Sequence, residues 1–306
     1  MAIRTTAVLA TAAALLTACH HDDPAAETAA RSGTPSSLQE LRGIDPCALF
    51  GAATSVGNRS LTVTGPVKFG SCTATVTDPA GTVDVNIALA WRSPQEPTPA
   101  EESWVKHRVI DGVEVTSASL WDQPNLPPRD QVVSASCQFI ARYPDGAALM
   151  VLASFPPAAD GCAIAEAVVT TAIAEYPKRP GWASSKFPTT TLTGTDPCAP
   201  VRSLETGHRV DWSSGTTVTS CYFTLDDHQM SVSLAHEPAD HPSTRDNPDL
   251  GGHQLLGDPA AGQVAVVVGP QFTVGARALL PAVEVSDVDE DTARTMLVAR
   301  AVADHY

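Results

Sequence analysis

Seven cysteines constrain this chain of 306 residues more than any other feature of its sequence. One of them is Cys19, close to the N-terminus, and the other six are Cys47, Cys72, Cys137, Cys162, Cys198 and Cys221. An even set of six predicts three disulfides and a protein that folds in an oxidising compartment. Six cysteines allow fifteen sets of pairings. No Cys-x-x-Cys segment occurs, so neither a zinc site nor a thioredoxin-type motif is indicated.

A four-residue segment occurs twice and reduces these fifteen possibilities. Asp45-Pro46-Cys47-Ala48 returns as Asp196-Pro197-Cys198-Ala199, and aspartate before proline is typical of a helix start. A second cysteine follows each copy, 25 residues later at Cys72 and 23 residues later at Cys221. The similar spacing predicts that Cys47 pairs with Cys72 and Cys198 with Cys221. The remaining pair is Cys137 with Cys162.

The hydrophobic pattern around each copy predicts an antiparallel sheet followed by a helix. Apolar residues alternate over 83–91 and 230–234, behind turns at 78–81 and 226–227. Further strands are expected over 131–142, 147–155, 263–268 and 271–280, and helices over 164–172 and 293–301. The Cys137–Cys162 pair would join a strand to the first of these helices. The expected fold class is α+β, with two tandem disulfide-stapled domains.

The N-terminus predicts export and lipidation. One positive charge at Arg4 precedes an apolar run over 7–16, which is too short to cross a bilayer and is typical of a secretory signal. Leu16-Thr17-Ala18-Cys19 resembles the bacterial lipobox, in which the cysteine is diacylated and becomes the mature N-terminus. Two acyl chains give stable membrane anchoring. Cys19 is therefore the predicted lipidation site, at the outer face of the cytoplasmic membrane.

These signals divide the chain into five segments. Residues 1–18 are the expected signal peptide, and 19–43 the lipidated cysteine with a flexible tether, because this stretch lacks apolar periodicity. Residues 44–178 form the first expected domain. Proline and glycine punctuate the expected linker at 179–193. Residues 194–306 form the second domain.

The charge balance excludes some partners. Cleavage before Cys19 removes one basic residue, Arg4, which leaves 18 basic and 34 acidic residues and a net charge of −16. A strongly acidic chain is a poor match for nucleic acid or for an anionic membrane surface. The expected contact with the membrane is through the lipid alone.

The lipobox, the Asp-Pro-Cys helix start and the partner cysteine together resemble actinobacterial surface lipoproteins that carry an uncharacterised Asp-Pro-Cys signature domain. The resemblance covers residues 44–176 and 195–306. Members often carry tryptophan soon after the second cysteine, whereas this chain has Thr73-Ala74 after Cys72 and Tyr222-Phe223 after Cys221. The resemblance implies an exported lipoprotein of a PsbP-like α+β fold, and it supplies no catalytic residues.

One serine and lysine pair fits a catalytic motif by spacing. Ser103-Trp104-Val105-Lys106 matches the Ser-x-x-Lys pattern of penicillin-binding proteins, but the Ser-Asp-Asn and Lys-Thr-Gly elements that complete that site are missing from the sequence. Residues 98–101 form a capping-box pattern. Ser103 and Lys106 are therefore expected on an ordinary amphipathic helix.

The second expected domain is rich in histidine: His208, His228, His236, His241 and His253. A zinc-protease helix needs histidines four residues apart, whereas His236 and His241 are five apart with Pro238 between them. Residues 251–262 are expected to form a long loop, which could carry binding residues.

The sequence favours a non-catalytic binding module of the cell envelope, with no cofactor and no metal. Its ligand would be an extracytoplasmic protein, a cell-wall fragment or a small molecule, and the acidity favours neutral or cationic ligands. The alternative is a divergent extracytoplasmic enzyme or metal-binding protein that uses the histidines of the second domain. Convergence of those histidines on one cleft would distinguish the two hypotheses.

Overall fold

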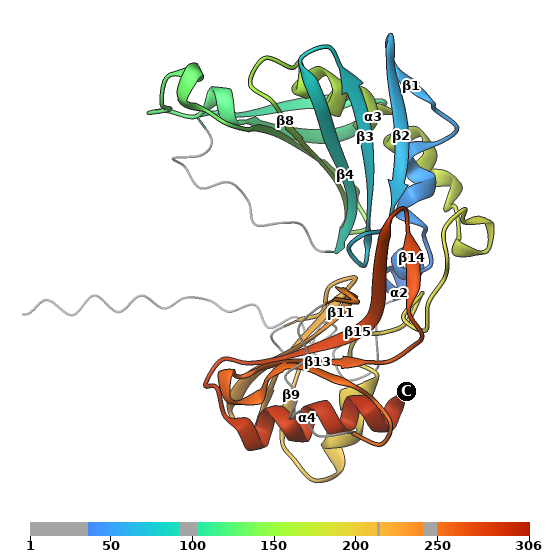
Figure 1. Cartoon of the computed structure of the whole chain (residues 1–306), viewed down its shortest axis with the longest axis vertical. Coiled ribbons are helices and arrows are strands. Elements are labelled where there is room, and N and C mark those ends of the chain that lie inside the picture. The colour runs from blue at the N-terminus through green and yellow to red at the C-terminus, as the bar shows by residue number, and fades with distance from the viewer. Residues whose placement is uncertain (1–35, 92–102, 213–214, 241–249) are drawn as a thin grey trace, which may run out of the picture. The chain divides into compact units, whose positions relative to one another are not determined.

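The computed structural model describes residues 36–91, 103–212, 215–240 and 250–306. They contain three disulfides. They form two antiparallel sheets and a few helices (Figure 1). This confirms the predicted α+β class in its coarse form. No helix among the described residues has the length and apolarity needed to span a membrane.

The first sheet has eight strands in the order β1-β2-β3-β4-β8-β7-β6-β5. Its strands are β1 (Ser55–Val56), β2 (Arg59–Gly65), β3 (Ser71–Asp78), β4 (Gly81–Trp91), β5 (Val105–Ile110), β6 (Val113–Ser119), β7 (Ala135–Arg142) and β8 (Ala147–Phe155). Helix α3 (Gly161–Glu175) packs on β7 and β8 and buries Ile164, Val168 and Ala172. These side chains follow helical spacing, so a single face of α3 covers a single face of the sheet.

The second sheet has seven strands in the order β12-β13-β15-β11-β10-β9, and β14 pairs with β15. Its strands are β9 (Val210–Asp211), β10 (Ser220–Leu225), β11 (His228–Pro238), β12 (Leu255–Asp258), β13 (Gln263–Val267), β14 (Phe272–Val274) and β15 (Arg277–Asp287). Helix α4 (Thr292–His305) packs on β13 and β15 (Figure 1). Asp291 caps α4 by accepting a hydrogen bond from the backbone N–H of Arg294.

Short helices fill the connections. They are α2 (Ser36–Arg42), η1 (Pro46–Phe50), η2 (Leu120–Asp122), η3 (Arg129–Gln131), η4 (Tyr176–Lys178), η5 (Trp182–Ser184), η6 (Pro200–Thr206) and η7 (Pro259–Ala261). The stretch that the sequence marked as a linker contributes to the packing, since Leu192 is fully buried and the Trp182 indole donates to the carbonyl oxygen of Arg42.

Several predicted elements are confirmed closely. The strand expected over 147–155 is β8, and the turns at 78–81 and 226–227 join β3 to β4 and β10 to β11. Asp226 and Asp227 both have positive φ, of 50° and 74°, as a two-residue hairpin turn with right-handed strand twist requires. All three predicted disulfides are present: Cys47–Cys72, Cys137–Cys162 and Cys198–Cys221.

Other predictions were wrong. The expected strand over 271–280 is a hairpin that turns at Gly275, whose φ of 59° no continuing strand adopts. Residues 36–42 of the expected tether form α2, because Leu38 and Leu41 are one helical turn apart and both are buried. Within the expected loop at 251–262, Leu255 and Leu256 are buried in β12.

The two helix starts also differ from expectation. Pro46 begins the short 3₁₀ helix η1 rather than an α-helix, and Pro197 lies in a turn ahead of η6. The predicted capping aspartates nevertheless act as caps. Asp45 accepts a hydrogen bond from the Cys47 backbone N–H at 2.9 Å, and Asp196 accepts one from the Cys198 N–H at 3.1 Å.

Candidate functional site

The face of the first sheet opposite α3 offers a broad surface with an apolar centre. Side chains alternate across a strand, so residues between those packed on α3 point to this opposite side. Register places Leu152 of β8 between Asn86 of β4 and Gln138 of β7, and Met150 beside Ile140 of β7. We call these five residues the open face. Leu152 is 41% exposed, and the other four are partly exposed.

Polar groups surround this apolar centre. The Asn86 side-chain amide donates to the hydroxyl oxygens of Ser71 and Thr73, at 3.2 and 3.3 Å. These bonds fix the amide plane and direct its carbonyl oxygen away from the two hydroxyls. On the same face, Arg142 of β7 donates to the Thr116 hydroxyl of β6 at 2.9 Å. An apolar centre with fixed amide and hydroxyl groups at its margin is suited to a ligand that is neutral and partly apolar.

The corresponding face of the second sheet carries carboxyl groups instead. Val283 and Val285 pack in the core beside α4, so Glu284 between them points to the opposite side. Burial raises the pKa of Glu284 to about 7, and a hydrogen bond and negative charge from Glu237 on β11 add to the shift. Ser220 and Ser233 join β10 to β11 through a hydroxyl hydrogen bond of 2.8 Å on this side. The Glu284 carboxyl therefore keeps its proton up to near-neutral pH.

The histidines of the C-terminal half have separate partners. His208 and His228 each contact a carboxylate at 2.7 Å, on Asp226 and Asp289 respectively. His253 contacts the carbonyl oxygen of Val267 at 2.9 Å. His241 lies outside the described residues. Among the residues that the structure describes, no group of three or more His, Cys, Asp or Glu side chains could hold a metal ion.

His236 has a different environment from the other histidines. It contacts the Pro66 carbonyl oxygen at 2.9 Å and lies between the rings of Phe69 and Phe272. Burial lowers its pKa. The neutral imidazole packs between two phenyl rings where β11 contacts the β2–β3 turn. The metal-binding histidines of a zinc protease lie instead on one helix, four residues apart.

The helix expected for Ser103 and Lys106 was a wrong prediction. Lys106 lies on strand β5, where its ammonium group pairs with Asp122 at 2.7 Å. Ser103 lies in the turn before that strand. The capping-box residues 98–101 lie outside the described residues. Ser103 and Lys106 therefore do not share the helical turn that the motif requires.

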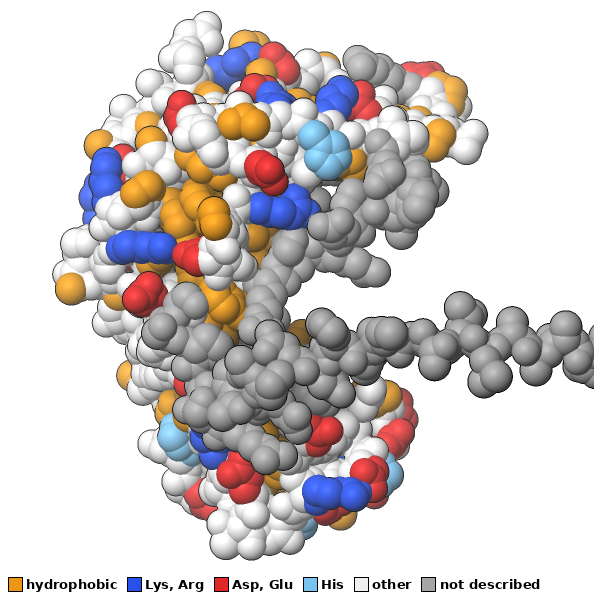
Figure 2. Space-filling view, turned by 180° about the vertical axis from the view of Figure 1, so that it is seen from behind, with side chains coloured by type: hydrophobic (Ala, Val, Ile, Leu, Met, Phe, Trp, Pro, Cys, Tyr) orange, Lys and Arg blue, Asp and Glu red, His pale blue; other side chains and the backbone are white. Residues whose placement is uncertain are grey.

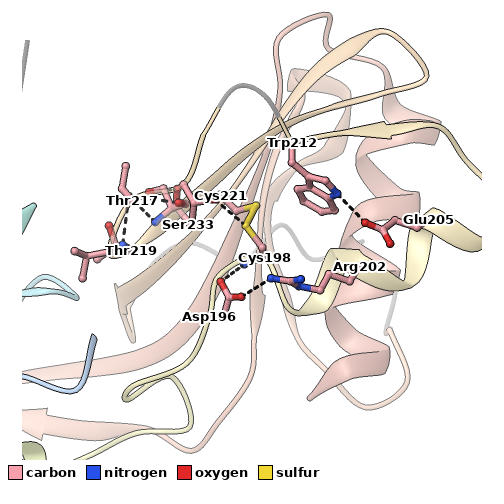
Figure 3. Close-up of a disulfide and its surroundings, with 12 residues drawn as sticks. Asp196, Cys198, Arg202, Glu205, Trp212, Thr217, Thr219, Cys221 and Ser233 are labelled. Atoms are coloured by element: carbon pink, nitrogen blue, oxygen red, sulfur yellow. Dashed lines mark hydrogen bonds and ion pairs between the residues drawn. A yellow bond between two sulfur atoms is a disulfide. The ribbon is translucent and has the colours of Figure 1, made fainter. Parts of the chain in front are cut away.

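The two Asp-Pro-Cys turns differ in charge. Asp196 pairs with Arg202 at 2.9 Å, next to the Cys198–Cys221 disulfide (Figure 3). It also pairs with the buried Arg42 at 3.1 Å. Arg42 also donates to the carbonyl oxygens of Thr217 and Val218. Asp45 is 1% exposed, and burial raises its pKa despite hydrogen bonds from Ser185 and from backbone N–H groups.

The surface charge is mixed. On the side that Figure 2 displays, basic side chains stand apart from one another among acidic and neutral ones, and apolar side chains gather between them. Proteins that bind nucleic acid usually carry a continuous basic patch. The displayed face is unlike such a patch.

Comparisons with known proteins found no match. No protein-family model matches the chain, and neither a curated protein nor a solved structure does.

Proposed function

We propose that the protein is an exported lipoprotein, anchored to the outer face of the cytoplasmic membrane through a diacylglycerol on Cys19, that binds an extracytoplasmic ligand without catalysing a reaction. The three intramolecular disulfides support an oxidising compartment. The lipobox-like sequence before Cys19 supports the anchor. The proposal includes membership of the Asp-Pro-Cys lipoprotein family and a PsbP-like fold.

The proposal divides the chain into two domains, at residues 44–178 and 194–306. Each range contains one Asp-Pro-Cys turn, one antiparallel sheet, one long helix on that sheet and one disulfide from the turn to a strand. This correspondence supports an internal duplication. The first domain carries the binding surface.

The single observation that carries the binding role is the open face. Leu152 is exposed in the middle of a sheet, where the four other apolar or amide side chains of the open face lie around it by register. Its neighbours Asn86 and Gln138 offer amide groups, which bind neutral polar groups through paired donors and acceptors. The ligand class that fits is a neutral cell-wall fragment or peptide with both amide and apolar parts.

Binding is tested by sedimentation of the purified protein, from residue 20 onward, with insoluble bacterial peptidoglycan. We expect the wild type to sediment and Leu152→Lys to remain in solution, because a lysine ammonium would replace the apolar centre. Val133→Lys is the matched control, since Val133 is 92% exposed and is not part of the open face. Equal sedimentation of all three proteins would remove the open face from the proposal, and failure of the wild type would remove this ligand class.

Anchoring is tested separately by fractionation of cells that express the full chain. Cys19→Ala should move the protein from the membrane to the soluble fraction, because the lipid is the proposed anchor. Retention of the variant on membranes would contradict the lipoprotein assignment and leave the sedimentation result unaffected.

A further inference from the structure

The six paired cysteines differ in how far solvent can reach them. Five are at most 6% exposed: Cys47, Cys72, Cys137, Cys198 and Cys221. Cys162 is the exception, since it is partly exposed and packs at the margin of the first core. Thiol–disulfide exchange requires a thiolate to reach a sulfur atom of the disulfide. Cys137–Cys162 is therefore the disulfide that an external thiolate can approach at a partly exposed cysteine.

The position of Cys162 in α3 stabilises negative charge on its sulfur. It is the second residue of a 15-residue helix, where backbone N–H groups lack partners within the helix. In the part of the chain that the structure describes, the side chain of the N-cap residue, Asp160, accepts no hydrogen bond from the helix. The positive end of the helix dipole lowers the pKa of a thiol placed there.

A buried hydroxyl group faces the same sulfur. The Ser119 oxygen, in a residue that is 8% exposed, lies 3.4 Å from Sγ of Cys162. This oxygen already accepts a hydrogen bond from the Trp121 backbone N–H at 3.1 Å. A sulfur in a disulfide carries no hydrogen, so the serine O–H donates in the contact with Cys162. It would donate more strongly to a thiolate.

We propose that Cys137–Cys162 is a thiol-exchange site, at which the thiolate of a small thiol or of a reducing protein opens the disulfide. The thiolate attacks Sγ of Cys162, forms a mixed disulfide and expels Cys137 as a thiolate. A second thiolate attacks the outer sulfur of the mixed disulfide and expels Cys162 as a thiolate. The two electrons gained by the protein come from the two external thiols, which leave as their own disulfide.

The fold tolerates this opening because α3 is held by more than the disulfide. Ile164, Ala165 and Val169 are fully buried against β7 and β8. Helix α4 packs on the second sheet in a similar way and contains no cysteine. Reduction therefore frees the N-terminal turn of α3 and the adjoining end of β7 while the sheet persists.

The test exposes the folded full-length protein to reduced glutathione and locates the modified cysteines by peptide mass spectrometry. We expect Cys162 to carry the mixed disulfide first, at a rate at least tenfold above that of any other cysteine, with Cys47–Cys72 and Cys198–Cys221 intact. Glutathione on Cys137 first, equal rates at the three disulfides, or no reaction before global unfolding would each overturn the proposal.

A variant pair tests the role of Ser119. Ser119→Ala should slow the release of Cys162 from the mixed disulfide about fivefold, which corresponds to one lost hydrogen bond of about 1 kcal/mol. It should also raise the pH at which the freed Cys162 reacts with iodoacetamide. Ser136→Ala is the matched control, because Ser136 lies on the opposite face of β7, next to Cys137. An equal effect of both substitutions on rate and pH profile would contradict the assigned contact.

Discussion

The two halves of the molecule use the same cysteine turn with opposite electrostatics. Asp45 in the first turn is buried with neutral hydrogen-bond donors, whereas Asp196 in the second is paired with Arg42 and Arg202. The sheet faces opposite the long helices differ in the same sense, since the first sheet presents amides and the second presents Glu237 and Glu284. The two halves therefore share a backbone arrangement but differ in the charge of the side chains placed on it. A difference in role between the halves would come from these charges.

The largest expected effect comes from the disulfides. Their sequence separations are 25, 25 and 23 residues, so loop closure should stabilise each by about 3 kcal/mol. Replacement of Cys198 and Cys221 by alanine should lower the free energy of unfolding by about 4 kcal/mol, because two buried sulfurs are also lost. Replacement of Cys137 and Cys162 should cost about 3 kcal/mol. Urea unfolding measures the free energy of unfolding of both double variants. A loss below about 1 kcal/mol in either variant would contradict the stabilisation expected from loop closure.

The two capping aspartates give the sharpest contrast. Asparagine preserves a cap and removes the charge. Asp196→Asn should destabilise the protein by about 2 kcal/mol, because it removes the carboxylate beside the buried Arg42. Asp45→Asn should stabilise it by up to about 1 kcal/mol, because a raised pKa means that the charged form costs stability at neutral pH. Thermal unfolding at pH 7 compares them, and shifts of the same sign would break the contrast.

The Glu284 carboxyl predicts a pH dependence. Its folded-state pKa of about 7 lies above the ordinary value of 4.5, so the folded state binds a proton that the unfolded state releases. Stability from this group is therefore present at low pH and declines as the pH rises through about 7. Glu284→Gln should flatten the decline between pH 4.5 and about pH 7, measured by urea unfolding. Glu205→Gln is the control, and an unchanged profile in Glu284→Gln would assign the dependence to another group.

The smallest expected effect concerns the open face. Leu152→Gln should change the free energy of unfolding by less than about 0.5 kcal/mol, because Leu152 is substantially exposed. Val151→Gln, one residue away, should cost several kcal/mol, because Val151 is fully buried. Thermal unfolding of the two variants measures whether the faces of β8 are as distinct as the alternation predicts, and comparable losses would show that they are not.

Sequence patterns predicted the elements whose signals are local. The strict alternation from Val83 to Trp91 identified β4. The duplicated cysteine spacing identified two disulfides and left Cys137–Cys162 as the remaining pair. Strand β5 was not predicted, because its consecutive residues Lys106, His107 and Arg108 lack apolar alternation. Helix α2 follows a polar stretch, and its signal was only Leu38 with Leu41.

The candidate site was harder to predict than the fold. The open face depends on which residues of β4, β7 and β8 become neighbours. Strands β4 and β8 are distant in sequence, so their register is set by tertiary packing and not by a local turn. The pairing of Glu237 with Glu284 likewise joins strands that are distant in sequence. One available signal was Glu284 itself, a charged residue between two valines of an alternating strand.

The order of the disulfides along the chain has a consequence for how the protein matures. Each paired cysteine bonds to the next one in sequence, first with second, third with fourth and fifth with sixth. When the chain enters the oxidising compartment with its N-terminus first, Cys72 can pair with Cys47 before Cys137 has entered. Each later pair can form in the same way. Oxidation that keeps pace with emergence gives the native set directly, whereas refolding of the complete reduced chain must select it from fifteen. Disulfide reshuffling, which takes seconds to hours, is then needed only when the complete reduced chain refolds.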